Sequence, residues 1–274
     1  MATKKKDLTN GPLSAVLFQV RYTPILNIER YIPAIQDYCR KAGFPLINRM
    51  RGDMIHINQN GEIEKIAIEQ WVFASADYQR TLIIDTEKLT FQVFDLSNYV
   101  FKELLDTFIQ FMHKIDTLVE ISLINRIGLR FINTIEEKPE LGWRRAIKPE
   151  FQGYPFPDDV DWADKELFSW TLQKNVKLIE PNIWSNFYAR IYQDATGRKY
   201  PGDIIRDPDG DIDYVSSKSL VTYIDLDHFI LFSNEEKEVI IPKIKEIFVA
   251  LHKVIESVFF SSLITKEAEQ VWSK

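Results

Sequence analysis

The stretch Ile121–Ile135, ISLINRIGLRFINTI, decides the predicted fold. Its β-branched and aromatic residues predict one long β-strand rather than a helix. Because side chains alternate along a strand, Arg126, Gly128 and Arg130 share one face and Leu129 lies on the other. Gly128 removes a side chain between the two arginines, so we expect another group to approach the backbone there.

Two interpretations of these arginines stay open. A guanidinium offers a planar fork of donors, which suits a carboxylate or another anion, so Arg126, Gly128 and Arg130 are candidate ligand-binding residues together with Arg21 of an earlier strand. Alternatively, the arginines cross the sheet to structural carboxylates or lie on a wet face. The second interpretation is favoured, since arginine is mostly a surface residue.

Composition limits the classes of partner. The chain has 274 residues, a net charge of −6 and 13% aromatic residues. Phosphate binding needs local positive charge, so nucleic acid is not the expected partner. The single cysteine, Cys39, excludes an internal disulfide and fits a reducing cytoplasm. No apolar run approaches the roughly 18–20 residues that span a bilayer, so we expect a cytoplasmic protein without a membrane segment.

Periodicity and turn residues predict an order of elements with strands and helices in both parts of the chain. Before the central strand, they predict strands at Leu13–Tyr22, Leu46–Arg51, Ile63–Ala74, Gln79–Asp85 and Thr90–Asp95, and helices at Ile32–Lys41 and Tyr99–Leu118. After it, they predict strands at Glu166–Lys174, Phe187–Gln193 and Leu220–Phe232, and helices at Glu236–Phe260 and Thr265–Trp272. Pro242 predicts a kink, or a short helix before the main one.

Short matches indicate an internal duplication. Val20-Arg21-Tyr22 resembles Leu129-Arg130-Phe131, and Ser97-Asn98 resembles Ser233-Asn234, each pair preceding a long helix that it is expected to cap.

We therefore predict an α+β fold of two pseudo-repeated halves, each an antiparallel sheet covered by a long helix. The first half covers residues 12–120 and the second covers residues 121–274, with irregular insertions at 136–164 and 194–219. The halves form one intimate unit, and the seam between them is the expected cleft.

The acidic loop 207–213 invites a calcium interpretation through Asp207, Asp209 and Asp211. An EF-hand needs an acidic first ligand, glycine at position six and glutamate at position twelve. Placing Gly210 sixth puts Ile205 first and Ser216 twelfth, so a turn with solvated carboxylates is favoured.

Other catalytic or cofactor motifs are not found in the sequence. Asp225 and Asp227 share a strand face beside His228, but further metal ligands are not spaced nearby, so a solvated face is expected. The sequence holds no zinc pattern, Walker loop, dinucleotide fingerprint or nucleophile elbow, so we assign no cofactor and no catalytic residue.

The segment after the central strand mixes aromatic residues with arginine. Trp143, Arg144, Arg145, Tyr154 and Trp162 are candidate partner-binding residues, because this composition is enriched at protein–protein hot spots. Two alternatives remain: a platform for single-stranded nucleic acid, or a loop that buries its aromatic residues over the sheet.

Several of these motifs together resemble a sporadically distributed family of uncharacterised prokaryotic α+β proteins. The resemblance rests on the opening strand with Arg21, the central motif Arg126-Ile-Gly-Leu-Arg130-Phe-Ile-Asn133, and Leu251-His252, Phe259 and Thr265 near the end. It implies no settled activity. The patchy distribution of the family implies horizontally moved genes, such as those of antiviral defence or toxin–antitoxin neighbourhoods.

The leading functional hypothesis is a non-enzymatic module that binds a partner protein, as an accessory or inhibitor in a defence or toxin–antitoxin system. The alternative is a protein, enzyme or not, that binds a small molecule or anion in an arginine-lined cleft between the halves. Nucleic-acid binding through the loop that contains Trp143 and Trp162 is a third hypothesis.

Overall fold

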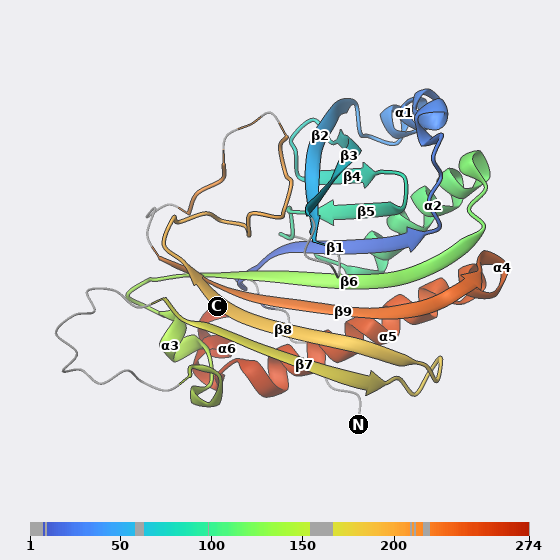
Figure 1. The fold of residues 1–274 in the computed structure, drawn as a ribbon. Coiled ribbons are helices and arrows are strands. Elements are labelled where there is room, and N and C mark those ends of the chain that lie inside the picture. Colours follow the sequence, from blue (N-terminus) through green and yellow to red (C-terminus); the bar gives the residue numbers. More distant parts are fainter. Residues whose placement is uncertain are drawn as a thin grey trace.

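The central strand is β6 (Leu123–Glu136), and it lies inside a nine-stranded, fully antiparallel sheet. The strand order is β2-β3-β4-β5-β1-β6-β9-β8-β7, which Figure 1 shows as one continuous curved sheet. The predicted α+β class is therefore confirmed.

This structure is a computed structural model that describes residues 8, 10–57, 63–97, 99–153, 167–208, 210, 212–215 and 220–273, with backbone only at 53–57, 63–68 and 234.

The remaining strands of the sheet are β1 (Leu13–Tyr22), β2 (Leu46–Ile57), β3 (Ile63–Ala74), β4 (Arg80–Ile84), β5 (Lys88–Val93), β7 (Ser169–Lys177), β8 (Trp184–Asp194) and β9 (Val221–Glu236). The helices are α1 (Ile32–Lys41), α2 (Phe101–Val119), α3 (Trp143–Ala146), α4 (Lys237–Ile240), α5 (Ile244–Val258) and α6 (Lys266–Trp272), with 3₁₀ turns at Ile28–Tyr31, Pro149–Phe151 and Ile241–Lys243 and a π-helical turn at Phe259–Leu263.

Pairing between β1 and β6 joins the two parts of the chain. Gln19 faces Gly128 and Arg21 faces Arg126 across this antiparallel pair. β5 lies on the outer side of β1, and β9 lies on the outer side of β6. The sequence suggested a sheet for each half, but the described strands form a single sheet, because the two opening strands hydrogen-bond to each other.

One face of the sheet packs against both long helices. The Phe18 side chain is fully buried, and its ring centroid lies 5.6 Å from that of Phe108 in α2 and 5.5 Å from that of Phe248 in α5. Since one residue of β1 contacts both helices, α2 and α5 cover the same face (Figure 1). Cys39 of α1 is also buried, which raises the pKa of its thiol to about 12.

Among the described residues, no helix combines the length and the apolarity that crossing a membrane requires.

Among the described residues, a second group of buried side chains covers part of the opposite face of the sheet. Tyr200 and Val215, from the segment between β8 and β9, pack on Ala15, Leu17 and Ile132. The remaining part of this face, which we call the open face, carries the charged residues of β6, β8 and β9.

Two predicted helix caps are wrong. Ser97 does not cap α2, whose N-cap is Val100, but donates its hydroxyl to the Asp95 carboxylate at 2.6 Å in a local turn. Ser233 and Asn234 lie within β9, which continues to Glu236 because it pairs with β6 up to that residue. A long-range strand pairing thus overrides a local cap signal.

Two other helix signals are confirmed. Pro242 lies in the 3₁₀ turn between the short α4 and the long α5, as expected for a residue without a backbone donor. Thr265 caps α6 by accepting a hydrogen bond from the Ala268 amide at 3.1 Å.

We predict that Phe18→Ala lowers the free energy of unfolding by about 3–5 kcal/mol, since the cavity would open between the sheet and both helices. Urea unfolding followed by circular dichroism measures this loss. Leu26→Ala, at a side chain that is 89% exposed, is the control and should change stability by less than about 0.5 kcal/mol. Equal losses in the two variants would contradict the shared role of Phe18.

Candidate functional site

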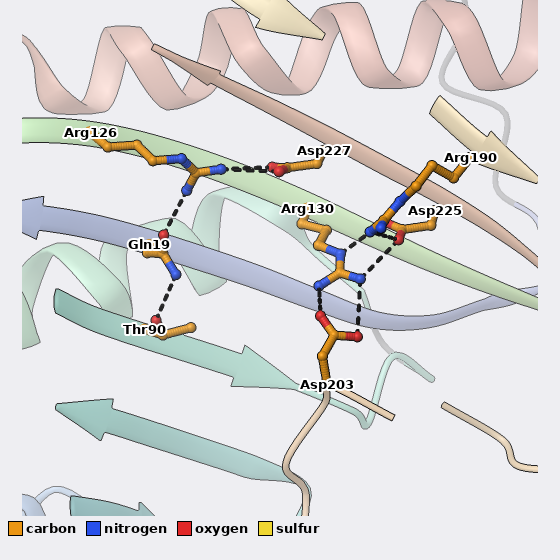
Figure 2. A network of polar contacts seen from close by, with 8 residues as sticks. All are labelled: Gln19, Thr90, Arg126, Arg130, Arg190, Asp203, Asp225 and Asp227. Carbon is orange, nitrogen blue, oxygen red and sulfur yellow. Dashed lines mark hydrogen bonds and ion pairs between the residues drawn. The ribbon is translucent and has the colours of Figure 1, made fainter. Parts of the chain in front are cut away.

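A network of charged side chains covers the open face around β6, as Figure 2 shows. Arg126 of β6 donates from Nη2 to both carboxylate oxygens of Asp227 in β9, at 3.1 and 3.0 Å. Its Nη1 donates to Gln19 Oε1 in β1 at 2.7 Å, and Gln19 donates to Thr90 of β5 at 3.2 Å. The network therefore ties four adjacent strands together through side chains.

The central glycine is explained by this arrangement. The Arg126 guanidinium lies over Gly128, where an added Cβ would come within 2.3 Å of Nη1 and 2.7 Å of Cζ. The group predicted to approach the glycine backbone is thus the arginine two residues earlier. Without Gly128, Arg126 could not reach Asp227 along this path.

Arg130 forms the second part of the network. It donates from Nε and Nη2 to the two oxygens of Asp225, each at 2.8 Å, and it also pairs with Asp203. Arg190 of β8 contacts the same Asp225 carboxylate, whose side chain is fully buried. A buried carboxylate is stable only with such partners, and here two guanidinium groups supply them.

The two parts of the network differ electrostatically. Burial lowers the pKa of Arg126 and raises the pKa of Asp227, which outweighs the attraction between them. Burial also acts against the charge of Arg130, but hydrogen bonds to Asp225 and Asp203 raise the pKa of Arg130 above its usual range. Burial acts to raise the pKa of Asp203, but the hydrogen bond to Arg130 more than offsets this effect and holds the pKa below its usual value. Charge is therefore most costly at the Arg126–Asp227 pair.

The structure brings the arginine candidates together. Arg21, Arg126, Gly128 and Arg130 lie on adjacent strands of the open face. Arg21 is exposed and forms no ion pair with any described residue. The guanidinium groups of Arg126 and Arg130 already donate hydrogen bonds to carboxylates of the same chain. This agrees with the second interpretation from the sequence, in which the arginines cross the sheet to structural carboxylates.

The aromatic candidates after β6 lie elsewhere. Trp143 is only 7% exposed and stacks on Phe168 with 5.4 Å between ring centroids. Arg144 lies over the Trp143 ring, and Arg145 pairs with Glu267 of α6. Trp143 is thus part of the core. Tyr154 and Trp162 lie outside the described residues.

The acidic loop gives no metal cluster in the part of the chain that is described. Asp209 and Asp211 lie outside the described residues, and Asp207 already has an interaction partner. Asp213 of the same loop pairs with Arg206.

The carboxylates of the network were missed by sequence reasoning. Asp225 and Asp227 were expected on a solvated face, but Asp225 is 1% exposed, so that expectation is wrong. A signal was present: two aspartates at alternate positions of one strand can match two arginines on one face of a neighbouring strand. Arg190 and Asp203 carried no comparable signal.

His228 points to the opposite face, away from these aspartates. It is fully buried, with Nδ1 3.2 Å from the Leu251 carbonyl of α5 and Nε2 2.8 Å from Ser185 Oγ of β8. Because a carbonyl can only accept, Nδ1 carries the proton of the neutral ring, while the Ser185 hydroxyl donates to the Val176 carbonyl at 2.8 Å. Burial lowers the pKa of His228 to about 4.

Comparison with known proteins adds no identification. No family model matches the chain, and no curated protein matches it significantly. The resemblance drawn from the sequence motifs therefore stays a prediction.

We predict that Gly128→Ala destabilises the protein by about 1–3 kcal/mol, because the new Cβ displaces the Arg126 guanidinium and leaves Asp227 unpaired. Chemical unfolding of a double-mutant cycle with Arg126→Ala tests the cause. In the Arg126→Ala background, Gly128→Ala should cost less than about 0.5 kcal/mol. The same cost in both backgrounds would show that the guanidinium is not responsible.

A second prediction concerns pH. The unfolded imidazole takes up a proton near its ordinary pKa of 6.5, whereas folded His228 stays neutral until about 4. Its contribution to stability is therefore full above pH 6.5 and is lost as the pH falls toward 4, by about 3 kcal/mol in total.

Unfolding measured from pH 7.5 to 4.5 should show a smaller loss of stability in His228→Gln, which keeps a polar side chain at this position without titrating. His113→Gln, at an exposed residue of α2, is the control and should follow the wild-type profile. If His228→Gln also follows the wild-type profile, His228 does not cause this pH dependence.

Proposed function

We propose that the protein is an interaction module that recognises a partner protein on the open face of the sheet. The observation that carries the proposal is a pair of exposed apolar side chains on neighbouring strands. Leu231 of β9 is 61% exposed and Trp184 of β8 is 62% exposed. Both point to the open face, because their neighbours Ile230 and Ser185 are buried on the other side.

Cations flank this apolar pair. Leu231 faces Arg126 across β6, Arg126 faces Arg21 across β1, and Trp184 faces Lys177 across β7. We call these five residues the open-face patch. Tryptophan and arginine are enriched among residues that dominate binding energy at protein interfaces. The chemistry favours a partner that presents an apolar side chain bordered by carboxylates, which Arg21 and Lys177 would meet.

The patch rests on a rigid base. The Arg126 guanidinium lies 4.2 Å from the Phe229 ring centroid, and Phe229 stacks on Tyr188 with 5.6 Å between centroids. Hydrogen bonds to Asp227 and Gln19 hold the same guanidinium (Figure 2). A surface ordered before binding loses less entropy on association, which favours recognition without rearrangement.

The alternative, an anion site at Arg126 and Arg130, has less support. Each guanidinium already donates to carboxylates of the chain, so an incoming anion would compete with Asp225, Asp203 and Asp227. Arg21 is the one arginine of this group without such a partner among the described residues, and it belongs to the open-face patch.

We also propose that the two halves are related by duplication. The strand order supports this idea, because β1 is flanked by β5 and β4, and β6 is flanked by β9 and β8. Aligning Arg21 with Arg130 also aligns Gln19 with Gly128. These two residues face each other across the β1–β6 pair, where the axis of a twofold pseudosymmetry would have to pass.

The gene context inferred from the family resemblance suggests where to find the partner. We propose that it is the product of a neighbouring gene, in a defence or toxin–antitoxin system that this protein assists or inhibits. Co-expression with its genomic neighbours, followed by size exclusion with mass detection, should give a complex of defined stoichiometry. Elution as a lone species with every neighbour would count against the proposal.

We predict that Trp184→Ala and Leu231→Ala each weaken this complex at least tenfold, which corresponds to about 1.4 kcal/mol. Biolayer interferometry with the co-purified partner measures the affinity. Ile47→Ala is the matched control, because Ile47 is 40% exposed on β2 at the far edge of the sheet. Undiminished affinity in the first two variants would exclude the open-face patch as the contact.

A further inference from the structure

A pocket of about 1260 Å³ lies where β1 begins and β6 ends. It is lined by residues from both halves of the chain, including the start of β1, residues 94–97, 99 and 100 before α2, the end of β6, and α5 and α6. We call it the seam pocket. The lining of the seam pocket includes no residue of the charged network or of the open-face patch, so neither explains it. Its volume exceeds the roughly 300–1,000 Å³ of ordinary small-molecule sites.

Aromatic rings form much of the wall. Tyr99 meets Phe131 edge to face with 6.2 Å between centroids, and Phe259 stacks near Trp272 at 6.5 Å. Phe131, Phe259 and Trp272 are each less than one-tenth exposed, so surrounding residues hold them in place. Such walls offer ring faces to a flat apolar group and negative π-electron density to a cation.

A hydrogen-bond acceptor lines this space. Asn133 of β6 lines the seam pocket and is 3% exposed. Its Nδ2 donates to the Ile224 carbonyl at 3.1 Å, which fixes the orientation of the amide, because a carbonyl can only accept. Among the described residues, none donates to the Oδ1 atom. An amide oxygen that lines a pocket and has no donor from the described residues can accept a hydrogen bond from a ligand with N–H or O–H groups.

A carboxylate lies nearby. Glu256 of α5 lines the seam pocket, is half-buried, and forms no ion pair with a described residue. Burial raises the pKa of Tyr99, and the negative charge of Glu256 raises it further. Tyr99 therefore stays protonated, and its hydroxyl lies 3.1 Å from His252 Nε2.

The cations around the seam pocket have partners of their own. Lys138 lies 3.8 Å from Glu136, and Lys199 lies over the Tyr200 ring at 5.5 Å. Glu256 and the Asn133 oxygen, which also belong to the lining, are both acceptors. Together with aromatic walls, they are complementary to a positively charged donor.

We propose that the seam pocket binds a small organic amine in its ammonium form. The flat apolar body of the amine lies against the aromatic wall, and the ammonium group meets Glu256 and Asn133 Oδ1. This site is independent of partner binding on the open face, and the failure of either proposal leaves the other intact.

Isothermal titration calorimetry with tryptamine tests the site on the full chain, with indole-3-propionate as a probe that has the same ring system and the opposite charge. Tryptamine should bind with a Kd below about 1 mM, and indole-3-propionate should not bind in this range. No heat from tryptamine, or equal binding of the two probes, would overturn the proposal without any variant.

Glu256→Gln keeps the shape of the side chain and removes its charge. It should weaken tryptamine binding about tenfold, as expected for a charge-assisted hydrogen bond. Glu246→Gln is the matched control, because Glu246 is an exposed glutamate of the same helix that does not line the seam pocket. Unchanged affinity in Glu256→Gln would overturn the assignment of the ammonium position.

Discussion

The hydrogen-bonded pairing of β1 with β6 is the constraint on which the rest of the structure depends. It places two strands that are distant in sequence side by side and extends two smaller sets of strands into one sheet. As inner strands, β1 and β6 have neighbouring strands along both edges. One face of these strands must then be apolar, because both long helices pack on it. Phe18 shows this directly, since its ring contacts residues of both α2 and α5.

The same constraint explains the charged network. Arg126 and Arg130 lie on an inner strand, so their charges are removed from water and need partners. Asp225 and Asp227 supply them from β9. A buried ion pair is weak evidence for stability, but these two pairs fit only the observed register of β6 and β9. A slip by one residue would turn both arginines into the helix-covered core, where no carboxylate meets them.

Two places in the described structure offer groups that a ligand or partner could contact. The open-face patch exposes Leu231 and Trp184 on rigid strands, and apolar groups of that size are stabilised when a partner covers them. The seam pocket is lined by Asn133, Glu256 and several aromatic side chains. The two places suit different ligands. The open-face patch is a surface on the strands that suits a partner protein, whereas the seam pocket is a concave space that suits a small molecule.

The sequence by itself determined the local elements. The bounds of β1, α1 and β3 agree with the predicted ranges, and Pro242 and Thr265 act as their chemistry requires, because alternation, proline geometry and capping depend on neighbouring residues. Only the tertiary structure decided the strand order, the extension of β9 through Asn234 and the partners of the central arginines. Arg126 and Asp227 are 101 residues apart, and no local pattern in the chain reports which distant strand will lie beside another.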